Sequence, residues 1–300
     1  MNIKSTSAPL VSFLTVNYHQ REVTLALVNS LSKLSYPNWE CIVVNNHEQD
    51  LELESALRTH KNVKVTSTNA NLGFAGGNNV GLEFCRGEYI YFINNDVEVE
   101  PYLLEPILEV FENNANIGMV SSKIVYFHDK TTIQYAGATE LNKITTRNTG
   151  IGHGEKDEGQ YDDVRETAFV HGASMVVPKV LIDEIGPMYD DFFLYYEEYD
   201  WCERFKQRGY EIIYCGLGKV YHKESVSTGV NSPLKVYYLT RNRLLFARRN
   251  YSMIMYSANW FYFTTLALPK GLIKHMIKGE FAQAKAMLKG YFWNFYSAKK

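Results

Sequence analysis

The first part of the chain alternates short apolar runs with amphipathic segments, and this alternation restricts the fold more than any other feature of the sequence. Short runs of β-branched and aromatic residues are typical of buried strands, whereas apolar residues repeated every three or four positions are typical of helices. Repeated strand–helix–strand units form a mostly parallel sheet covered by helices on both faces, with ligands at the carboxyl ends of the strands. We expect strands over 10–18, 40–46, 62–68 and 89–93, and helices over 21–34, 51–60 and within 69–85.

The composition fits a large folded unit in a reducing compartment. With 300 residues, of which 46% are hydrophobic and 14% aromatic, the chain can bury a large core. The apolar run 9–16 is interrupted by Ser12 and Thr15 and lacks a small-residue cleavage site, which favours a first strand over a signal peptide and predicts a cytoplasmic protein. The cysteines are scattered, without zinc-site spacing, so we expect free thiols at Cys41, Cys85, Cys202 and Cys215.

Charge is distributed unevenly along the chain. The net charge of −2 argues against a general nucleic-acid-binding protein. Residues 1–234 carry 19 Lys and Arg against 32 Asp and Glu, a balance of −13, whereas residues 235–300 carry 12 against the single Glu280, a balance of +11. The C-terminal part therefore presents a different kind of surface from the rest of the chain.

Beyond about residue 115 the regular alternation ends. The segments 118–127 and 168–178 have the composition of strands. Between them, the Gly-, Thr- and Asp-rich stretch 137–166 predicts an irregular excursion.

Three polar residues follow the fourth predicted strand. The segment YFINNDVEVEP (91–101) begins as a buried strand and then places Asn94, Asn95 and Asp96 at its carboxyl end. A carboxylate at this edge can hold a Mg²⁺ ion that in turn binds a diphosphate. The alternative is an Asx turn that only caps the strand.

A glycine-rich segment, NLGFAGGNN (71–79), opens the third predicted helix. Helix N-terminal amides bind anions and glycines allow close approach, so this loop can cradle a phosphate or a nucleotide. Its glycines fit neither the Gly-x-Gly-x-x-Gly pattern nor a P-loop, because no Gly-Lys-Ser/Thr follows. A tight strand-to-helix turn is the alternative.

Carboxylates are crowded in the segment DDFFLYYEEYDWCERFKQRGYEIIYC (190–215), which predicts a helix and then a strand over 211–215. Clustered carboxylates repel one another and raise at least one pKa, as a general base requires. A solvated helix face is the alternative, but the surrounding aromatic residues fit solvent poorly. The crowded carboxylates are Glu197, Glu198, Asp200 and Glu203.

Seven segments occur in a specific order: VNYHQ, YPNWECIVVNN, NLGFAGGNNVGL, GEYIYFINNDVEVEP, VHGASMVVPK, DDFFLYYEEYDWCERFKQRGY and VYHKES. Together they closely resemble the inverting family-2 glycosyltransferases with a GT-A fold, especially the rhamnosyltransferase-like branch that builds bacterial surface polysaccharides. The resemblance covers about residues 8–245.

The resemblance implies a GT-A fold, that is, a Rossmann-like, mostly parallel nucleotide-binding sheet flanked by helices, followed here by a helical basic extension. We accordingly expect a glycosyltransferase domain over 1–245 and an amphipathic basic helical region over 246–300. Within the domain, residues 1–115 would form the nucleotide-sugar half and 116–245 the acceptor and catalytic half.

The resemblance also implies a nucleoside-diphosphate sugar as donor and Mg²⁺ or Mn²⁺ as cofactor. Asp96 occupies the position of the DXD-type motif that contacts the metal. His222 matches a histidine that completes the metal site in some members, with a structural role as the alternative. The implied nucleotide-sugar contacts are Thr15, Asn17, Tyr18, Asn45, Asn71, Gly73, Gly76, Gly77, Asn78, Asn94 and Asn95.

The Glu197-Glu198 pair matches a Glu-Asp pair whose second member is the usual catalytic base. We therefore expect Glu198 to be the base, with Glu197 in reserve, and Asp200 to pair with Arg204 at i+4. The candidate acceptor contacts are His171, Tyr195 and Trp201.

Two positions depart from the family pattern. Asn45 stands where an aspartate usually contacts the pyrimidine ring, which leaves the choice of nucleotide open. Glu198 is one methylene longer than the usual aspartate, a difference that matters at a reacting centre.

We expect a metal-dependent inverting transferase that moves rhamnose or another hexose to a saccharide or polyprenyl-diphosphate-linked acceptor in cell-surface polysaccharide synthesis. A non-catalytic nucleotide-sugar-binding protein of the same fold is one alternative. A nucleotidyltransferase is another, but it would need a glycine-rich basic loop after the first strand, where VNYHQREV has no glycine. An NAD-linked oxidoreductase would need Gly-x-Gly-x-x-Gly at the same place.

The basic tail predicts a membrane-surface anchor. Residues 270–295 place apolar side chains at spacings of three and four with lysines largely off that stripe, the pattern of an interfacial amphipathic helix. We expect it to hold the protein on the anionic inner face of the cell membrane. A transmembrane helix over 251–269, or packing of the stripe on the protein itself or on a second subunit, are the alternatives.

Overall fold

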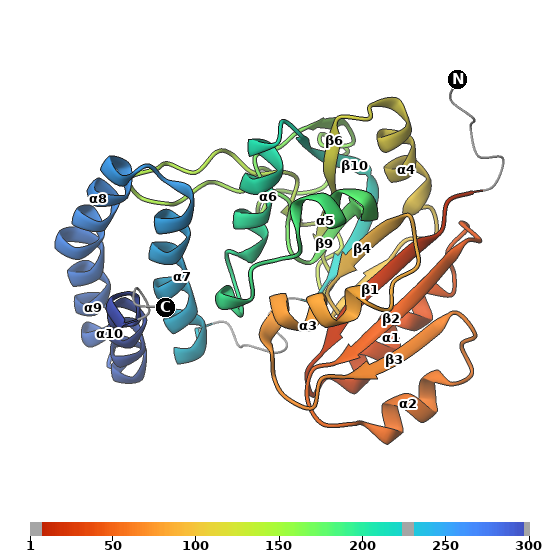
Figure 1. Ribbon diagram of the computed structural model, residues 1–300, viewed down its shortest axis with the longest axis horizontal. Coiled ribbons are helices and arrows are strands. Elements are labelled where there is room, and N and C mark those ends of the chain that lie inside the picture. Colours follow the sequence, from red (N-terminus) through yellow and green to blue (C-terminus); the bar gives the residue numbers. More distant parts are fainter. Residues whose placement is uncertain (1–7, 224–230, 297–300) are drawn as a thin grey trace.

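The computed structural model describes residues 8–223 and 231–296, so the last two residues of the segment VYHKES lie outside the described part. Figure 1 shows a twisted sheet flanked by helices, with a group of C-terminal helices standing beside it. The mixed α/β fold with a mostly parallel sheet, predicted from the alternation, is confirmed.

The first part of the chain forms the predicted elements with ends that shift by a few residues. They are β1 (Val11–Asn17), α1 (Arg21–Leu31), β2 (Trp39–Asn45), α2 (Leu51–Leu57), β3 (Val63–Ser67), α3 (Gly73–Leu82) and β4 (Tyr89–Ile93). The second part adds β5 (Val97–Val99), α4 (Leu104–Asn113), β6 (Ile117–Tyr126), β7 (Ile133–Tyr135), β8 (Val164–Glu166), β9 (Ser174–Pro178), α5 (Lys179–Ile185), the 3₁₀ turn η1 (Asp190–Phe192), α6 (Glu197–Gln207) and β10 (Glu211–His222).

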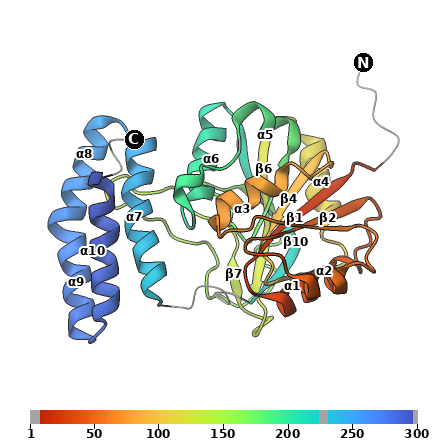
Figure 2. The ribbon, with the colours of Figure 1, turned by 60° about the horizontal axis from the view of Figure 1, so that its bottom comes forward.

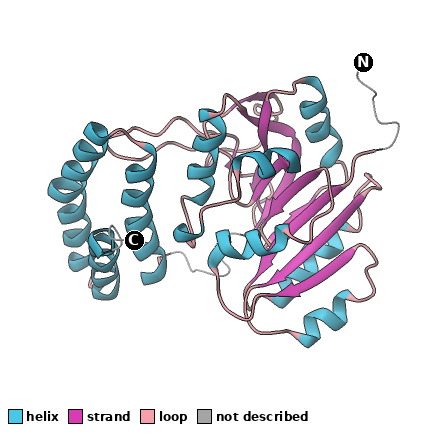
Figure 3. Ribbon diagram, viewed as in Figure 1, coloured by secondary structure: helices cyan, strands magenta, loops and turns pink. Residues whose placement is uncertain are grey.

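The sheet has the strand order β3-β2-β1-β4-β9-β6-β10-β5. Figure 3 shows the strands in magenta, with helices in cyan around them. The four strands from β3 to β4 are parallel. Strand β9 is antiparallel to both β4 and β6, and β10 is parallel to β6. Strands β1, β4, β6 and β10 therefore run in one direction, and their carboxyl ends meet at one edge of the sheet.

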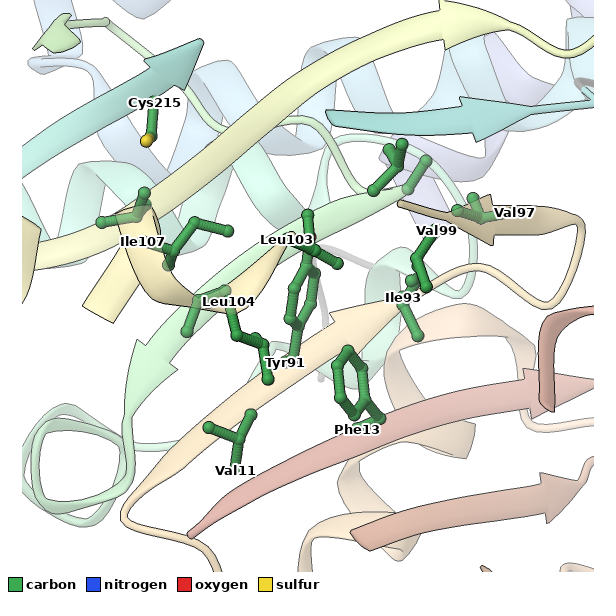
Figure 4. Close-up of a cluster of buried hydrophobic side chains, with 14 of the residues drawn as sticks. Val11, Phe13, Tyr91, Ile93, Val97, Val99, Leu103, Leu104, Ile107 and Cys215 are labelled. Atoms are coloured by element: carbon green, nitrogen blue, oxygen red, sulfur yellow. The ribbon is translucent and has the colours of Figure 1, made fainter. Parts of the chain in front are cut away.

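Both faces of the sheet are buried because side chains alternate along each strand. Phe13 and Tyr91 point to the face covered by α1, α2 and α4, where their rings stack with centroids 4.9 Å apart (Figure 4). Leu14 and Phe92 point to the opposite face, which α3, α5 and α6 cover. Tyr91, the first residue of the segment YFINNDVEVEP, is thus core, and polarity begins only where β4 ends.

Two strand predictions need correction. Strand β9 begins at Ser174 and not at residue 168, because Ala168 donates its N–H to Ala138 of the excursion and the chain then turns at His171. Strand β10 continues to His222 and not only to residue 215. A shift in register between Cys215 and Lys219 interrupts the alternation there and obscures the second half of the strand in the sequence.

The C-terminal part is a set of helices: α7 (Pro233–Asn250), α8 (Met253–Tyr262), the π-helical turn η2 (Phe263–Ala267), α9 (Leu268–Ile277) and α10 (Phe281–Tyr296). Figure 2 shows α7, the α8–α9 segment and α10 standing side by side. A Cβ atom on Gly290 would lie 2.5 Å from the carbonyl oxygen of Tyr237, so glycine allows α10 to approach α7 closely. Helix α7 crosses residue 245 without a break, and the expected division of the chain there stays a prediction.

The single amphipathic helix predicted over 270–295 is wrong. The chain turns at Gly279, whose φ of +70° is unfavourable for residues with a side chain, and it returns as α10. The predicted apolar stripe is divided as a result: Tyr291 is buried against Leu244 and Phe263, whereas Ile277 is 81% exposed. Among the residues described, no helix is both long and apolar enough to cross a bilayer.

Candidate functional site

A cleft of about 370 Å³ opens at the edge of the sheet where β1, β4 and β10 end. It brings together most of the residues that the sequence singled out, from segments that are far apart in the chain. Of the predicted site residues, its walls contain Tyr18, Asn71, Gly73, Asn94, Asn95, Asp96, His171, Tyr195, Glu197, Glu198 and His222.

Two of the other predicted nucleotide contacts, Asn17 and Asn45, do not line the cleft. Asn17 and Asn45 are fully buried and hydrogen-bonded to each other, with Nδ2 of Asn17 2.8 Å from Oδ1 of Asn45. Asn17 also accepts a hydrogen bond from Thr24, which in turn accepts one from Asn95. This buried network orients the strand ends and leaves Asn95 at the cleft.

Gly76, Gly77, Asn78 and Thr15 also lie away from the cleft walls. A Cβ atom on Gly77 would lie 2.9 Å from Val16, so this glycine allows α3 to pack closely on β1. Asn78 donates to the carbonyl of Phe74, and Thr15 is fully buried. Gly73 does line the cleft, with a φ of +73° and no space for a side chain beside Phe193.

Asn46 holds the glycine-rich loop and was not predicted from the sequence. Its Nδ2 donates to the carbonyl of Gly73 at 2.9 Å, and its Oδ1 accepts from the N–H of Leu72 at 3.0 Å. The only sequence signal for it is its position directly after Asn45, at the carboxyl end of a strand. Asn46 fixes the loop to β2, so the loop has a defined shape before any ligand binds.

Asp96 and His222 meet at the floor of the cleft. Nε2 of His222 lies 3.1 Å from Oδ1 of Asp96, and both residues are buried. Nδ1 of His222 lies 2.8 Å from Oε1 of Gln134. Since that oxygen can only accept, Nδ1 donates to it, which fixes the ring with Nε2 facing Asp96. Gln134 was not predicted, because it lies in a region without a readable motif.

The Asp96–His222 pair fits a divalent cation. Nε2 of His222 and Oδ1 of Asp96, two atoms that can ligate a metal, lie together at the carboxyl end of the sheet, and the other ring nitrogen of the histidine is fixed by Gln134. Among the described residues, no three His, Cys, Asp or Glu side chains form a complete metal cluster. Mg²⁺ commonly binds through one or two protein ligands plus phosphate oxygens and water, so such a pair suits an ion shared with a diphosphate.

The two adjacent glutamates lie at the start of α6, on another wall of the cleft. The turn that precedes them, residues 191–196, contains three bulky residues with positive φ angles: Phe193 at +61°, Tyr195 at +70° and Tyr196 at +76°. Such angles cost about 1–3 kcal/mol each and persist only where the surroundings enforce them. The turn directs the chain so that Glu197 and Glu198 face the cleft.

Burial changes the acidity of both glutamates. It raises the pKa of Glu198 to about 7. Burial and, after it, the negative charge of Glu198 raise the pKa of Glu197 well above its ordinary value. The Oε2 atoms of both side chains are buried without a hydrogen-bond partner. A carboxylate with a raised pKa and a free oxygen in a cleft can accept a proton near neutral pH.

Asp200 and Trp201 face away from the cleft. Asp200 accepts from Nε of Arg249 at 2.8 Å and from Asn250 at 2.9 Å, and it also pairs with Arg204 at 3.4 Å. The predicted i+4 pair is therefore present. Trp201 is fully buried and donates its Nε1–H to a carbonyl oxygen of the α5–α6 connection, so the acceptor contact predicted for it is wrong in this structure.

His171 and the start of α7 also line the cleft. Burial and, less strongly, the neighbouring His222 ring lower the pKa of His171 to about 3, so its imidazole is neutral. Leu234 and Lys235 are the lining residues of α7, and the Lys235 ammonium lies 5.9 Å from the centroid of the Tyr195 ring. The sequence indicated neither of these two residues, because α7 carries none of the seven motifs.

The comparisons with known proteins agree with this geometry. Residues 12–185 match the model of the family described as glycosyl transferase family 2. A low-salt glycan biosynthesis hexosyltransferase, Agl10 of Haloferax volcanii, is 25% identical over 89% of this chain and 83% of its own length.

Two solved structures show the same fold at low sequence identity. The mannosyltransferase PcManGT from Pyrobaculum calidifontis, in complex with GDP-Man and Mn²⁺, has a TM-score of 0.61 and 13% identity over 97% of this chain and 88% of its own. GalNAc-T7 with UDP, GalNAc and Mn²⁺ has a TM-score of 0.63 and 13% identity, over 79% of this chain and 48% of its own. These neighbours are GT-A glycosyltransferases, so the GT-A fold expected from the sequence is confirmed. The chain belongs to glycosyl transferase family 2 and is a glycosyltransferase.

Proposed function

We propose that this protein is a metal-dependent inverting hexosyltransferase that transfers a sugar from a nucleoside diphosphate to a lipid-linked saccharide in cell-surface polysaccharide synthesis. The observation that carries the proposal is the joint presence, in one cleft, of the Asp96–His222 pair and the two glutamates with raised pKa. The first pair suits the charge of a diphosphate, and the second suits removal of a proton from a hydroxyl group.

The donor would lie between the ends of β1 and β4 and the glycine-rich loop. Three residues of the cleft wall would contact the nucleotide: Tyr18 through its ring, Asn71 through its side-chain amide and Gly73 through its backbone. The structures of related fold hold GDP-Man or UDP, which supports a nucleotide-sugar donor here. A Mg²⁺ or Mn²⁺ ion held by Asp96 and His222 would neutralise the negative charge that develops on the leaving diphosphate.

Glu198 would remove the proton of the acceptor hydroxyl. With a pKa of about 7, this carboxylate is ionised in an appreciable fraction near neutral pH and is basic enough to accept a proton. Direct attack by the activated hydroxyl, on the side opposite the diphosphate, would invert the configuration of the anomeric carbon. The charge of Glu198 keeps Glu197 protonated to higher pH, which assigns the base role to one member of the pair.

The acceptor would approach from the α7 side, where the protein presents an apolar and basic surface. The tip of the α9–α10 hairpin exposes Ile277 by 81% and Phe281 by 68%, next to Lys274 and Lys278. Glu280 of this tip accepts a hydrogen bond from Asn231, two residues before α7, whose first turn lines the cleft. A lipid-linked acceptor held in an anionic bilayer would therefore reach the cleft along this edge.

The direct test is a screen of nucleotide sugars for release of the nucleoside diphosphate in the presence of Mn²⁺. We expect one donor to be hydrolysed slowly without acceptor, and chelation with EDTA to stop the reaction. Activity that persists in EDTA would contradict the metal dependence. Donor binding without turnover, both in this screen and with lipid-linked saccharide acceptors, would support the alternative of a non-catalytic nucleotide-sugar-binding protein.

A further inference from the structure

The turn 191–196, which directs both glutamates toward the cleft, is held from outside by Asn242 of α7. The Nδ2 atom of Asn242 lies 2.8 Å from the carbonyl oxygen of Phe192, 2.7 Å from that of Leu194 and 2.8 Å from that of Tyr195. Asn242 is completely buried. One amide group thus contacts three carbonyl groups of the same short turn.

Arg241 supports the same turn and orients the amide of Asn242. Its Nη2 donates to the carbonyl oxygen of Phe192 at 2.6 Å and also to that of Asp191. Its Nε donates to Oδ1 of Asn242 at 2.7 Å, which leaves Nδ2 directed at the turn. The guanidinium lies 4.5 Å from the centroid of the Trp293 ring of α10, so the C-terminal helices fix it in place.

The turn needs such external donors because its own conformation is unfavourable. Phe193, Tyr195 and Tyr196 all have positive φ, a region that bulky residues avoid. Within the turn, the carbonyl oxygen of Phe192 also accepts from the N–H of Leu194, whereas those of Leu194 and Tyr195 accept from Asn242. Glu197 and Glu198 follow immediately, so any relaxation of the turn moves both carboxylates.

We propose that Arg241 and Asn242 are positioning residues, which hold the turn 191–196 in its strained form and thereby aim Glu198 into the cleft. The inference rests on the proposed function, in which Glu198 is the base. It also gives the C-terminal helices a part in the reaction, because α7 and α10 carry the groups that fix the catalytic wall.

Donor binding should not depend on this arrangement. The turn does touch the glycine-rich loop, since the carbonyl oxygen of Phe193 accepts from the N–H of Phe74 at 2.6 Å. The loop, however, is held separately by Asn46, whose side chain bonds to Gly73 and Leu72. A variant that releases the turn should therefore lower kcat and leave the affinity for the nucleoside diphosphate nearly unchanged.

The first experiment measures the turn directly and requires no substrate. In Asn242→Leu, a residue of similar size without donors, amide hydrogen exchange should accelerate at least tenfold in the peptide covering 191–200. Arg243→Leu is the matched control: Arg243 lies on the same helix, is 7% exposed and donates to the carbonyl of Thr145, not to the turn. Unchanged protection of 191–200 in Asn242→Leu, or equal loss in both variants, would overturn the proposal.

The second experiment is a double-mutant cycle on hydrolysis of the donor found in the screen. Asn242→Leu should lower kcat roughly 10²-fold, the effect expected for a misplacement of about 1 Å at a reacting centre. In the Glu198→Gln background the same substitution should change kcat by less than about threefold, because the group that it positions is already inactive. An equal loss in both backgrounds would indicate a general structural defect and would overturn the positioning role.

The two experiments separate failure of this inference from failure of the proposed function. If Glu198→Gln alone leaves the rate unchanged, the base assignment fails, and the proposal that Asn242 aims a base fails with it, whatever the exchange data show. If Asn242→Leu does not fold, Arg241→Lys takes its place, because it keeps the charge but has no second nitrogen to donate to Oδ1 of Asn242 while the first donates to the turn. In Arg241→Lys we then expect the same two effects, faster amide exchange in 191–200 and a loss of kcat that depends on Glu198, but both smaller than in Asn242→Leu.

Discussion

The two acidic positions of the cleft differ in their neighbours more than in their own chemistry. Asp96 faces an imidazole nitrogen 3.1 Å away, which gives it a partner suited to sharing a cation. Glu198 has a buried oxygen without a partner, and burial raises its pKa to about 7. In the proposed function one carboxylate would bind a cation and the other would accept a proton, and each role predicts a different loss on mutation.

Substitution of Asp96 by Asn should abolish Mn²⁺-dependent donor binding and leave the fold intact. Asparagine keeps the shape of the side chain but loses the charge that a divalent cation requires. Calorimetry with the donor, in the presence and absence of Mn²⁺, measures the effect, and the melting temperature of the free protein serves as the control. Equal donor affinity in the variant and the wild type would exclude Asp96 as a metal ligand.

Substitution of Glu198 by Gln should lower kcat by roughly 10²–10⁴, with donor affinity preserved. The rate of the wild type should rise as the pH increases through about 7, because only the ionised carboxylate accepts a proton. A folded-state pKa raised above 4.5 also means that the folded protein loses stability as the pH rises from about 4.5 to 7, and the glutamine variant should lack this loss. If Glu197→Gln produces these effects instead, the base is the neighbouring residue.

At the level of elements, the sequence predicted what depends on local periodicity and missed what depends on distant contacts. The strands β1 to β4 and the polar residues after β4 were predictable, because alternation and turn residues are local signals. Gln134 and Asn242 were not, because their roles arise only when segments about 90 and 50 residues away fold against them. Trp201 was misassigned for the same reason, since aromatic composition cannot distinguish a cleft wall from a core.

The junction of α6 with the end of α7 predicts a stability effect at Asp200. This carboxylate is 1% exposed and accepts from Arg249 and Asn250, which ties α6 to the C-terminal helices. Asp200→Ala should lower the free energy of unfolding by about 3 kcal/mol, because it leaves two arginines without their buried partner.

Urea denaturation measures this effect, and Glu203→Ala is the control. Glu203 lies on the same helix but forms a more exposed pair with Lys206, so its loss should change the free energy of unfolding by about 0.5 kcal/mol or less. Equal effects of the two variants would show that Asp200 does not link the helices.

On the scale of the whole molecule, the cleft and the basic tail lie on adjoining parts of one surface. Helix α7 contributes Leu234 and Lys235 to the cleft at its first turn. Figure 2 shows this start of α7 at the same end of the helical group as the turn between α9 and α10. A protein that binds a bilayer through that end would hold its cleft next to the membrane surface, where a lipid-linked acceptor is confined.

The hairpin tip should therefore control binding to anionic vesicles. We expect the full chain to sediment with phosphatidylglycerol-containing liposomes at low salt and to be partly released at high salt, since each lysine near an anionic surface contributes about 1 kcal/mol. Replacing Ile277 and Phe281 together by Glu should abolish sedimentation, because both side chains are largely exposed at the tip.

The control is Ile254→Glu, since Ile254 is 85% exposed but lies at the start of α8, at the opposite end of the helical group (Figure 1). Loss of binding in this control alone would place the membrane at the other end and separate it from the cleft. If the double variant still sediments with the vesicles, the tip is not the part that binds the bilayer. If the wild type forms dimers that bury Ile277 and Phe281, the tip binds a second copy of the chain and not a bilayer.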